Sequence, residues 1–275
     1  MITHPDKVLF PDDGITKSEM AAYHEAIAPL MLPHIRRRPI TMERFPSGIA
    51  SKGFIQKDVS KGFPAWLKRV ETPKKGGIVN YPLANDARSL EWLVNQNAIT
   101  LHVWTSRVPN LGKPDVCVFD LDPSEDDEDA LREAALWVRD VLEEMSVPSW
   151  VKTSGSKGFH IVTAVKGRAT FDAVSGWSGK VAATLVARHP KTFTTAFTKA
   201  DRGGRIYLDV ARNRPGATFA AVYTVRARAG APVSAPCTWD EIKAGSVGPR
   251  SFTLRNMAAR VAKVGDLWAP LGARR

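Results

Sequence analysis

The stretch DVCVFDLDPSEDDEDALREAALWVRDVLEEM, Asp115 to Met145, holds the clearest structural pattern in this chain of 275 residues. Its first eight residues form an apolar run with β-branched and aromatic side chains, which predicts a strand. Apolar residues then recur every three or four positions, which predicts a helix. They are Leu131, Ala134, Ala135, Val138, Leu142 and Met145. A strand followed by an amphipathic helix indicates a fold that mixes helices and sheets.

Two aspartates lie at the end of the predicted strand. Because strand side chains alternate between faces, Asp120 and Asp122 share one face, whereas Phe119 and Leu121 point to the other. Two carboxylates this close repel each other unless a cation balances them, and divalent metals with oxygen ligands are the usual solution. The acids at positions 125–129 suit the N-terminus of a helix. The pair therefore predicts a metal site, with an ordinary solvated acidic loop as the alternative.

A loop rich in glycine and serine, TSGSKGFH, follows from Thr153 to His160. Such loops let backbone N–H groups approach a phosphate closely, and Lys157 adds a positive charge. The GxxxxGK[ST] pattern of P-loops is not present. Next to a metal site the loop indicates phosphate binding, whereas by itself it is more typical of a tight hairpin turn.

A third carboxylate, Asp209, ends the short apolar strand RIYLDV. Three carboxylates from two strands would hold two metal ions, which activate a 3′-hydroxyl and stabilise the leaving pyrophosphate in phosphoryl transfer. The alternative is an aspartate that caps a turn. His102 and His160 lie in apolar, strand-like runs, where histidine is more often a core residue than a ligand.

The remaining elements follow from the same patterns. Thr16 and Glu19 form a capping box for a helix that Pro33 is expected to end. Further helices are predicted at ARSLEWLVNQNA, SGWSGKVAATLVARH and SFTLRNMAARVAK. Strands are predicted at RPITMERF, GFIQKDV, GIVNYPL, SWVKT, FHIVTAV, RIYLDV and AAVYTVRAR.

The composition favours a polyanionic partner. A formal net charge of +11 and a pI near 9.8 attract polyanions, nucleic acid above all, although charge that serves only solubility is the alternative. Cys117 and Cys237 have no CxxC spacing, which suits a reducing cytoplasm. The start MITHPDKVLF lacks a signal pattern, and no apolar run reaches the roughly 18 residues of a spanning helix. We expect a cytoplasmic protein without membrane contact.

Four ordered segments carry a resemblance to a known family. They are HPDKVLFPDDGITK, VFDLDPS, TSGSKGFH and IYLDVARN. Together they resemble the polymerase domain of bacterial end-joining DNA ligase D and its stand-alone primase-polymerase relatives, in the archaeo-eukaryotic primase superfamily. The likeness covers almost the whole chain. It implies an α+β primase-polymerase fold and a single catalytic domain over residues 1–275. Within it, an N-terminal α/β lobe that binds DNA ends (about 1–110) would pack against a catalytic β-sheet lobe flanked by helices (111–275).

The resemblance also implies roles for individual residues. Asp120, Asp122 and Asp209 would hold two catalytic divalent ions, Mn²⁺ preferred over Mg²⁺. The incoming nucleoside triphosphate would contact His102, Ser154, Ser156, Lys157, Gly158, His160 and Arg226. Lys7 and Lys17 would bind the 5′-phosphate of the downstream strand. Lys17 lies in the first turn of a helix, whose free N–H groups and dipole favour an anion. Phe54 would stack on the template, and the partner would be gapped or broken double-stranded DNA in the nucleoid.

The sequence departs from the family pattern in several places, among them His4, which stands where the relatives usually have Asn. Ile55 follows Phe54 where a second aromatic residue is common, and Glu43 stands where a basic residue is usual. The connector from His102 to Asp120 is short, and no KxDG motif of ligases is present. We therefore expect a stand-alone gap-filling polymerase that prefers ribonucleotides. Three alternatives remain: a polymerase of non-homologous end joining that works with a separate DNA ligase, a haloacid-dehalogenase-like phosphatase, and a non-catalytic module that binds DNA ends.

Overall fold

The computed structural model describes residues 2–59, 62–167 and 169–273, and the chain divides into two compact units. The first unit comprises Met1–Pro109, Thr218–Ser234 and Phe252–Gly265, and the second comprises Asn110–Ala217, Ala235–Ser251 and Asp266–Arg275. The units therefore differ from contiguous lobes over 1–110 and 111–275. The reason lies in pairing, because Phe219 lies opposite Val103 in a sheet of the first unit. Val233 N–H also donates to Phe252 O within that unit.

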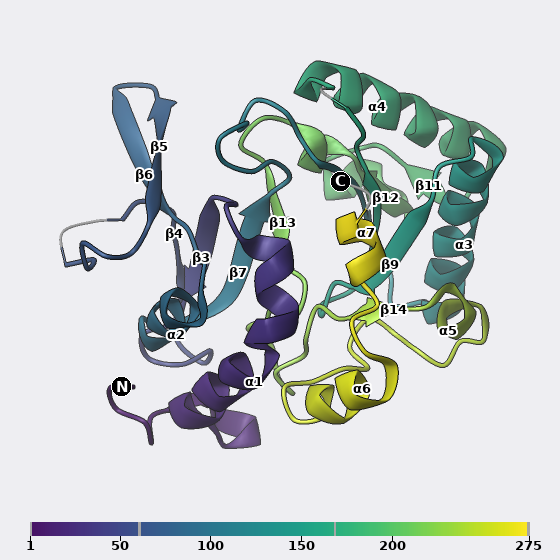
Figure 1. Ribbon diagram of the computed structural model, residues 1–275. Coiled ribbons are helices and arrows are strands. Elements are labelled where there is room, and N and C mark those ends of the chain that lie inside the picture. Colours follow the sequence, from purple (N-terminus) through teal and green to yellow (C-terminus); the bar gives the residue numbers. More distant parts are fainter. Residues whose placement is uncertain (1, 60–61, 168, 274–275) are drawn as a thin grey trace. The chain divides into compact units, whose positions relative to one another are not determined.

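The second unit is built on a sheet of six strands in the order β11-β12-β8-β10-β9-β14. Figure 1 labels β9, β11, β12 and β14 of this sheet. The central strand β8 runs antiparallel to both of its neighbours, β10 and β12. The strand bounds are β8 Val116–Asp122, β9 Ser149–Thr153, β10 Phe159–Ala164, β11 Phe193–Thr194, β12 Ile206–Asp209 and β14 Pro236–Cys237.

Two long helices cover one face of this sheet. They are α3 (Glu128–Glu144) and α4 (Phe171–Arg188). Phe119 of β8 contacts Trp177 of α4 edge to face, with ring centroids 5.9 Å apart. The face of β8 that carries Phe119 is therefore buried under α4, and the face with Asp120 and Asp122 points the other way. The shorter elements of this unit are η2 (Lys199–Asp201), η3 (Ala211–Asn213), α5 (Trp239–Lys243) and α7 (Ala269–Ala273).

The first unit combines a four-stranded sheet, in the order β13-β7-β3-β4, with two two-stranded sheets. Its strands are β1 Val8–Phe10, β2 Ile15–Thr16, β3 Ile40–Arg44, β4 Phe54–Gln56, β5 Arg69–Lys74, β6 Gly77–Pro82, β7 Ala98–Trp104 and β13 Thr218–Ala220. Its helices are η1 Pro11–Asp13, α1 Lys17–Ile35, α2 Ala87–Asn95 and α6 Met257–Val264. Helices and sheets in both units confirm the α+β fold class. None of the described helices is long and apolar enough to cross a membrane.

Helix α1 begins as predicted and ends later than predicted. Thr16 and Glu19 form the expected capping box. The expectation that Pro33 ends the helix is wrong, since α1 continues to Ile35 and contains both Pro29 and Pro33. Each proline lacks an N–H donor and so removes one hydrogen bond of the helix. Burial of the apolar residues of the last turn offsets that cost.

The segment AAVYTVRAR, residues 220–228, was predicted to be a strand and is not one. Only Ala220 belongs to β13, and Tyr223 has a positive φ of 65°, which breaks an extended backbone. Thr224 accepts a hydrogen bond from Leu101 N–H through its side chain, at 2.8 Å. The β-branched and aromatic residues of this segment therefore reflect burial in an irregular loop rather than pairing in a sheet.

Candidate active site

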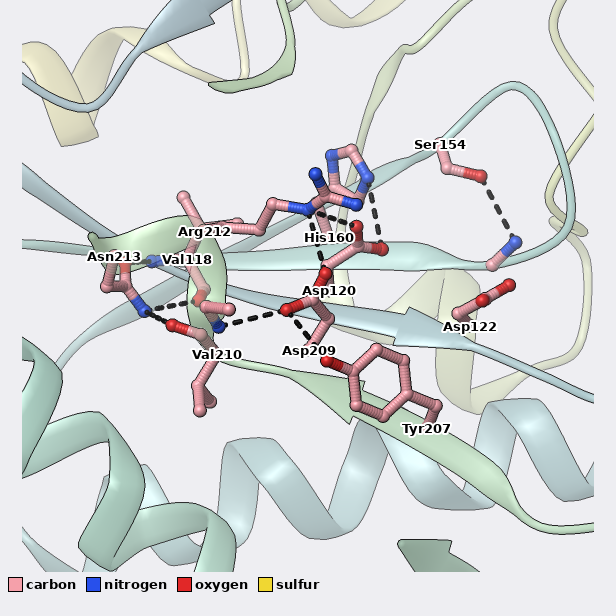
Figure 2. Close-up of polar contacts among 12 residues, drawn as sticks. Val118, Asp120, Asp122, Ser154, His160, Tyr207, Asp209, Val210, Arg212 and Asn213 are labelled. Atoms are coloured by element: carbon pink, nitrogen blue, oxygen red, sulfur yellow. Dashed lines mark hydrogen bonds and ion pairs between the residues drawn. The ribbon is translucent and has the colours of Figure 1, made fainter. Parts of the chain in front are cut away.

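Four polar side chains form a row across the sheet of the second unit. Asp209 of β12 lies opposite Asp120 of β8, Asp120 lies opposite His160 of β10, and His160 lies opposite Lys152 of β9. Directly opposed residues share a face of a sheet. Figure 2 shows the side chains of Asp120, His160 and Asp209 directed toward one another. Asp122, two residues farther along β8, belongs to the same face.

Two guanidinium groups balance the carboxylates. Arg212 Nε lies 3.2 Å from Asp120 Oδ2 and 3.0 Å from Asp209 Oδ2, and so bridges two strands (Figure 2). Arg202 Nη1 lies 2.8 Å from Asp122 Oδ2. Neither arginine was predicted from the sequence, because Arg202 and Arg212 lie outside the long helices and strands and a single basic residue there carries no periodic signal.

The position of Arg212 is set by the residue that follows it. Asn213 is fully buried and bonds the main chain of Val118 twice, through its Oδ1 to the N–H and through its Nδ2 to the carbonyl, each at 2.8 Å. These bonds fix the short helix η3 to β8. Arg212 is therefore held above the two carboxylates by the amide side chain of its neighbour.

Charge pairing keeps the central carboxylate of the row, Asp120, ionised. Burial by itself would raise the pKa of Asp120, but His160, Arg212 and Lys152 more than offset it and hold the pKa well below its usual range. Tyr207 O–H lies 3.2 Å from Asp209 Oδ1. Burial, followed by the charge of Asp209, raises the pKa of Tyr207 to about 12, so its hydroxyl keeps its hydrogen. Asp209 also accepts from Ala211 N–H at 2.9 Å.

The three aspartates offer oxygen ligands of the kind that hard divalent ions prefer. Among residues 2–59, 62–167 and 169–273, no group of three or more His, Cys, Asp or Glu side chains is arranged as a metal site. The oxygens instead face Arg212 and Arg202. A divalent ion would fit this donor set when these guanidinium groups turn aside, because either kind of cation balances the same charge. Their role as metal ligands stays a prediction.

The loop from Ser154 to Gly158 is held closed by its own serine. Ser154 Oγ accepts from the N–H groups of Ser156 and Gly158, both at 3.1 Å. Ser154 N–H donates to Gly158 O at 2.9 Å. The role of these backbone N–H groups in phosphate binding stays a prediction, and two of them would have to exchange the partner that they have in the loop. Lys157 is about half exposed and pairs with Asp126, at 3.3 Å.

The remaining nucleotide residues from the sequence analysis lie in the first unit. His102 of β7 directs Nε2 toward Glu43 Oε2 of β3, at 3.9 Å. The hydrogen bond of His102 lowers the pKa of Glu43 against the opposing effect of burial, and the charge of Arg226 lowers it further. Glu43, which departs from the family pattern, is therefore a partner of His102 and lies within reach of the charge of Arg226.

A cluster of three cations lies at the N-terminus of α1. It comprises Lys7, Lys17 and Arg44. Lys17 is almost fully buried, and its N–H donates to Lys7 O at 2.8 Å. Burial, then the charges of Lys7 and Arg44, lower the pKa of Lys17. A site where cations repel one another gains from an anion. Arg44 was not among the residues that the sequence predicted.

The helix itself offers less to that anion than the sequence suggested. Ser18 N–H donates to Pro5 O at 2.9 Å, and Glu19 N–H donates to Thr16 Oγ1 at 3.3 Å. The N–H groups of the first turn are therefore used within the chain, contrary to the expectation that they are free. An anion here would be held by side-chain charge.

Phe54 presents an exposed aromatic face on β4. Its side chain is about half exposed, as is that of Ile55, which points to the opposite face of the strand. The guanidinium carbon of Arg44 lies 5.3 Å from the centre of the Phe54 ring. Arg44 therefore connects the predicted stacking residue with the cation cluster of α1 within the first unit.

Comparisons with known proteins agree with the motifs. The family described as LigD, primase-polymerase domain, matches residues 16–268. The multifunctional non-homologous end joining protein LigD of Mycolicibacterium smegmatis is 36% identical over 275 residues, which are 99% of this chain and 36% of that protein. The LigD protein of Pseudomonas aeruginosa is 30% identical over 275 residues, 98% of this chain and 32% of that protein. The chain thus spans about a third of the length of these relatives.

A solved structure is similar throughout. It is the polymerase domain from Mycobacterium tuberculosis ligase D in complex with DNA, with 33% sequence identity and a TM-score of 0.94. The match covers 99% of this chain and 98% of that one. Both the sheets and the helices described above therefore have counterparts in that domain.

Proposed function

The chain belongs to the LigD primase-polymerase domain family, and on that premise we propose that it is a template-dependent nucleotidyltransferase that fills short gaps in DNA during repair. The observation that carries the proposal is the row of Asp209, Asp120 and His160, with Asp122 on the same face. Phosphoryl transfer needs carboxylates for metal ions and hydrogen-bond donors for a triphosphate, and these residues offer both.

The chemistry of each side chain indicates its role in the reaction. Asp120, Asp122 and Asp209 would hold two divalent ions, Mn²⁺ preferred, which when bound supply charge stabilisation for the transferred phosphoryl group. Tyr207 and the N–H of Ala211 keep the Asp209 carboxylate oriented. The predicted contacts of the triphosphate are His160, Ser154, Ser156, Lys157 and Gly158 in the second unit, and His102 and Arg226 in the first.

The substrate is gapped or broken double-stranded DNA together with nucleoside triphosphates. A net charge of +11 supports capture of such a polyanion. The relatives are named as end-joining proteins, so end joining with sealing by a separate DNA ligase is the second setting in which the polymerase would act. Because the chain belongs to a polymerase family, we do not retain the alternative of a haloacid-dehalogenase-like phosphatase.

Primer extension on DNA with a short gap tests the function. The purified chain is incubated with a labelled primer in the gap, nucleoside triphosphates, and either Mn²⁺ or Mg²⁺. We expect templated addition with both ions and more with Mn²⁺. A gel shift of the same DNA without any addition would instead identify a non-catalytic module that binds DNA ends.

Sugar selection gives a second prediction. We expect ribonucleotides to be added in preference to deoxyribonucleotides when the two compete on one gapped template. The physical reason is that a pocket built to bond the 2′-hydroxyl leaves a polar group unpaired with a deoxy sugar, which costs about 1–3 kcal/mol. Counting each product by alkaline cleavage measures the ratio, and a preference for deoxyribonucleotides contradicts the prediction.

The cation cluster of α1 predicts recognition of a 5′-phosphate. We expect wild-type protein to bind gapped DNA more tightly when the downstream strand ends in a 5′-phosphate than in a 5′-hydroxyl. Charge-assisted hydrogen bonds from the ammonium groups of Lys7 and Lys17 are worth roughly 1–3 kcal/mol. The Lys7→Ala, Lys17→Ala double variant should lose this difference. Fluorescence anisotropy on the paired substrates measures it.

Two controls separate this effect from general charge and from folding. Lys180→Ala, Lys191→Ala removes two exposed lysines of the second unit and should keep the phosphate preference. Lys7→Ala, Lys17→Met keeps the buried stem of Lys17, so it should lose the preference without losing stability. Equal affinity of the wild-type protein for both ends would refute the site.

A further inference from the structure

A lysine lies in the interior of the second unit, at the end of the carboxylate row. Lys152, on β9, is 0% exposed, and its Nζ lies 2.8 Å from Nδ1 of His160. On the other side of the ring, His160 Nε2 lies 3.3 Å from Asp120 Oδ1. Lys152, His160 and Asp120 thus form one chain of polar contacts through the imidazole ring, set by the pairing of β9, β10 and β8.

The two contacts determine where the hydrogens of the ring lie. A lysine ammonium donates hydrogen bonds and cannot accept them. Its contact therefore requires an acceptor at Nδ1, and the neutral ring of His160 then carries its hydrogen on Nε2. If the proton moves from Lys152 to Nδ1, the ring becomes an imidazolium with a hydrogen on each nitrogen. Nε2 carries a hydrogen in both arrangements and donates it to Asp120.

Asp120 by itself would not maintain this orientation during catalysis. An aspartate oxygen that binds a metal ion gives up a lone pair to that ion. The contact with Lys152 lies on the opposite side of the His160 ring and does not involve that oxygen. Lys152 therefore keeps a hydrogen on Nε2 when Asp120 is engaged elsewhere. This is the usual role of a partner on the second nitrogen of a functional histidine.

We propose that Lys152 is a positioning residue that fixes His160 as a hydrogen-bond donor toward the site, so that His160 binds an anionic oxygen of the substrate and not a metal ion. The inference rests on the proposed function only for the identity of that oxygen, which would belong to the triphosphate of the incoming nucleotide. A metal ion at Nε2 would need a free lone pair on that nitrogen. Because Lys152 donates to Nδ1, the ring hydrogen lies on Nε2, and no lone pair is available there for a metal ion.

Nitrogen NMR of the wild-type chain, with ¹⁵N in its histidines, tests the assignment without any substitution in the protein under study. Spectra are recorded with and without Mg²⁺, and the signals of His160 are identified by their loss in His160→Gln. We expect a hydrogen on Nε2 in both spectra. A ring that carries its only hydrogen on Nδ1 in the presence of Mg²⁺ would overturn the proposal.

Metal and nucleotide titrations give two independent readouts. His160→Gln should still bind Mn²⁺, with a loss of no more than the roughly 10–100-fold expected when the hydrogen-bond partner of a metal ligand is removed, because the ring is not itself a ligand. A loss well beyond about 100-fold would overturn the proposal. Lys152→Met has a side chain of the same length without charge or donors. We expect it to weaken nucleoside triphosphate binding about fivefold or more and to allow a hydrogen on Nδ1, while Mn²⁺ affinity does not fall. Lys180→Met, at an exposed position of α4, is the matched control.

The outcomes separate this inference from the function it rests on. A folded Lys152→Met variant with wild-type nucleotide affinity and an unchanged His160 spectrum would overturn the role of Lys152. If Lys152→Met does not fold, the wild-type spectra and the His160→Gln titration decide. Failure of wild-type primer extension with a hydrogen on Nε2 would refute the polymerase and leave the Lys152 assignment supported.

Discussion

Asp209→Asn is expected to abolish nucleotide addition while leaving DNA affinity nearly unchanged. The substitution keeps the size of the side chain and an oxygen that can accept from Tyr207 and Ala211, so the strand should keep its place. It removes one of the negative charges that would bind a metal ion beside Asp120. We expect a loss in rate of about 10³-fold, or roughly 4 kcal/mol in barrier. Single-turnover primer extension measures the rate, and anisotropy measures DNA binding.

The acidic first turn of α3 provides the control. Asp129→Asn removes a charge from the same region, where Asp129 is exposed and pairs with Arg132 along the helix. We expect nearly wild-type extension, since exposed ion pairs contribute about 0–1 kcal/mol and this one lies outside the row. Asp122→Asn should behave like Asp209→Asn. Near wild-type extension by either of these two variants would exclude the carboxylates from the mechanism.

The sequence predicted the site as far as a single strand allows. The alternation of apolar and acidic residues in VFDLD placed Asp120 and Asp122 on one face, because alternation is a local property of a strand. It could not place Lys152 in the row, since that depends on the register between β9 and β10, which no local pattern determines.

Residues outside regular elements were harder to predict. The bridge from Arg212 to Asp120 joins positions 92 residues apart in the sequence. Its geometry depends on the bonds of Asn213 to the main chain of Val118, and polar side chains of this kind have no periodicity. Thr224 is a second example. Its side chain accepts a hydrogen bond from Leu101 N–H, and the apolar residues around it form an irregular loop and not the predicted strand. Tertiary hydrogen bonds, and not local propensity, therefore determine the conformation of these segments.

Position 158 requires glycine because there is no room for a Cβ atom, and not because of its backbone conformation. A Cβ atom at this position would lie 1.7 Å from the carbonyl oxygen of Leu121 and 2.9 Å from its carbon. These are main-chain atoms of β8, next to Asp120 and Asp122, so they cannot move without moving the carboxylates. The glycine thus lets the loop from Ser154 lie directly against the strand that carries two of the predicted metal ligands.

Gly158→Ala is therefore expected to push the loop away from β8 and break the two bonds between Ser154 and Gly158. We expect the free energy of unfolding to fall by about 2–4 kcal/mol, as for a severe overpacking, and nucleoside triphosphate binding to weaken. Denaturant titration and nucleotide binding measure the two effects. Gly179→Ala, in α4, is the control, because its Cβ meets nothing within 4 Å and should stabilise by about 0.4–1 kcal/mol. Equal stability of Gly158→Ala and wild type would show that the loop does not rest on Leu121.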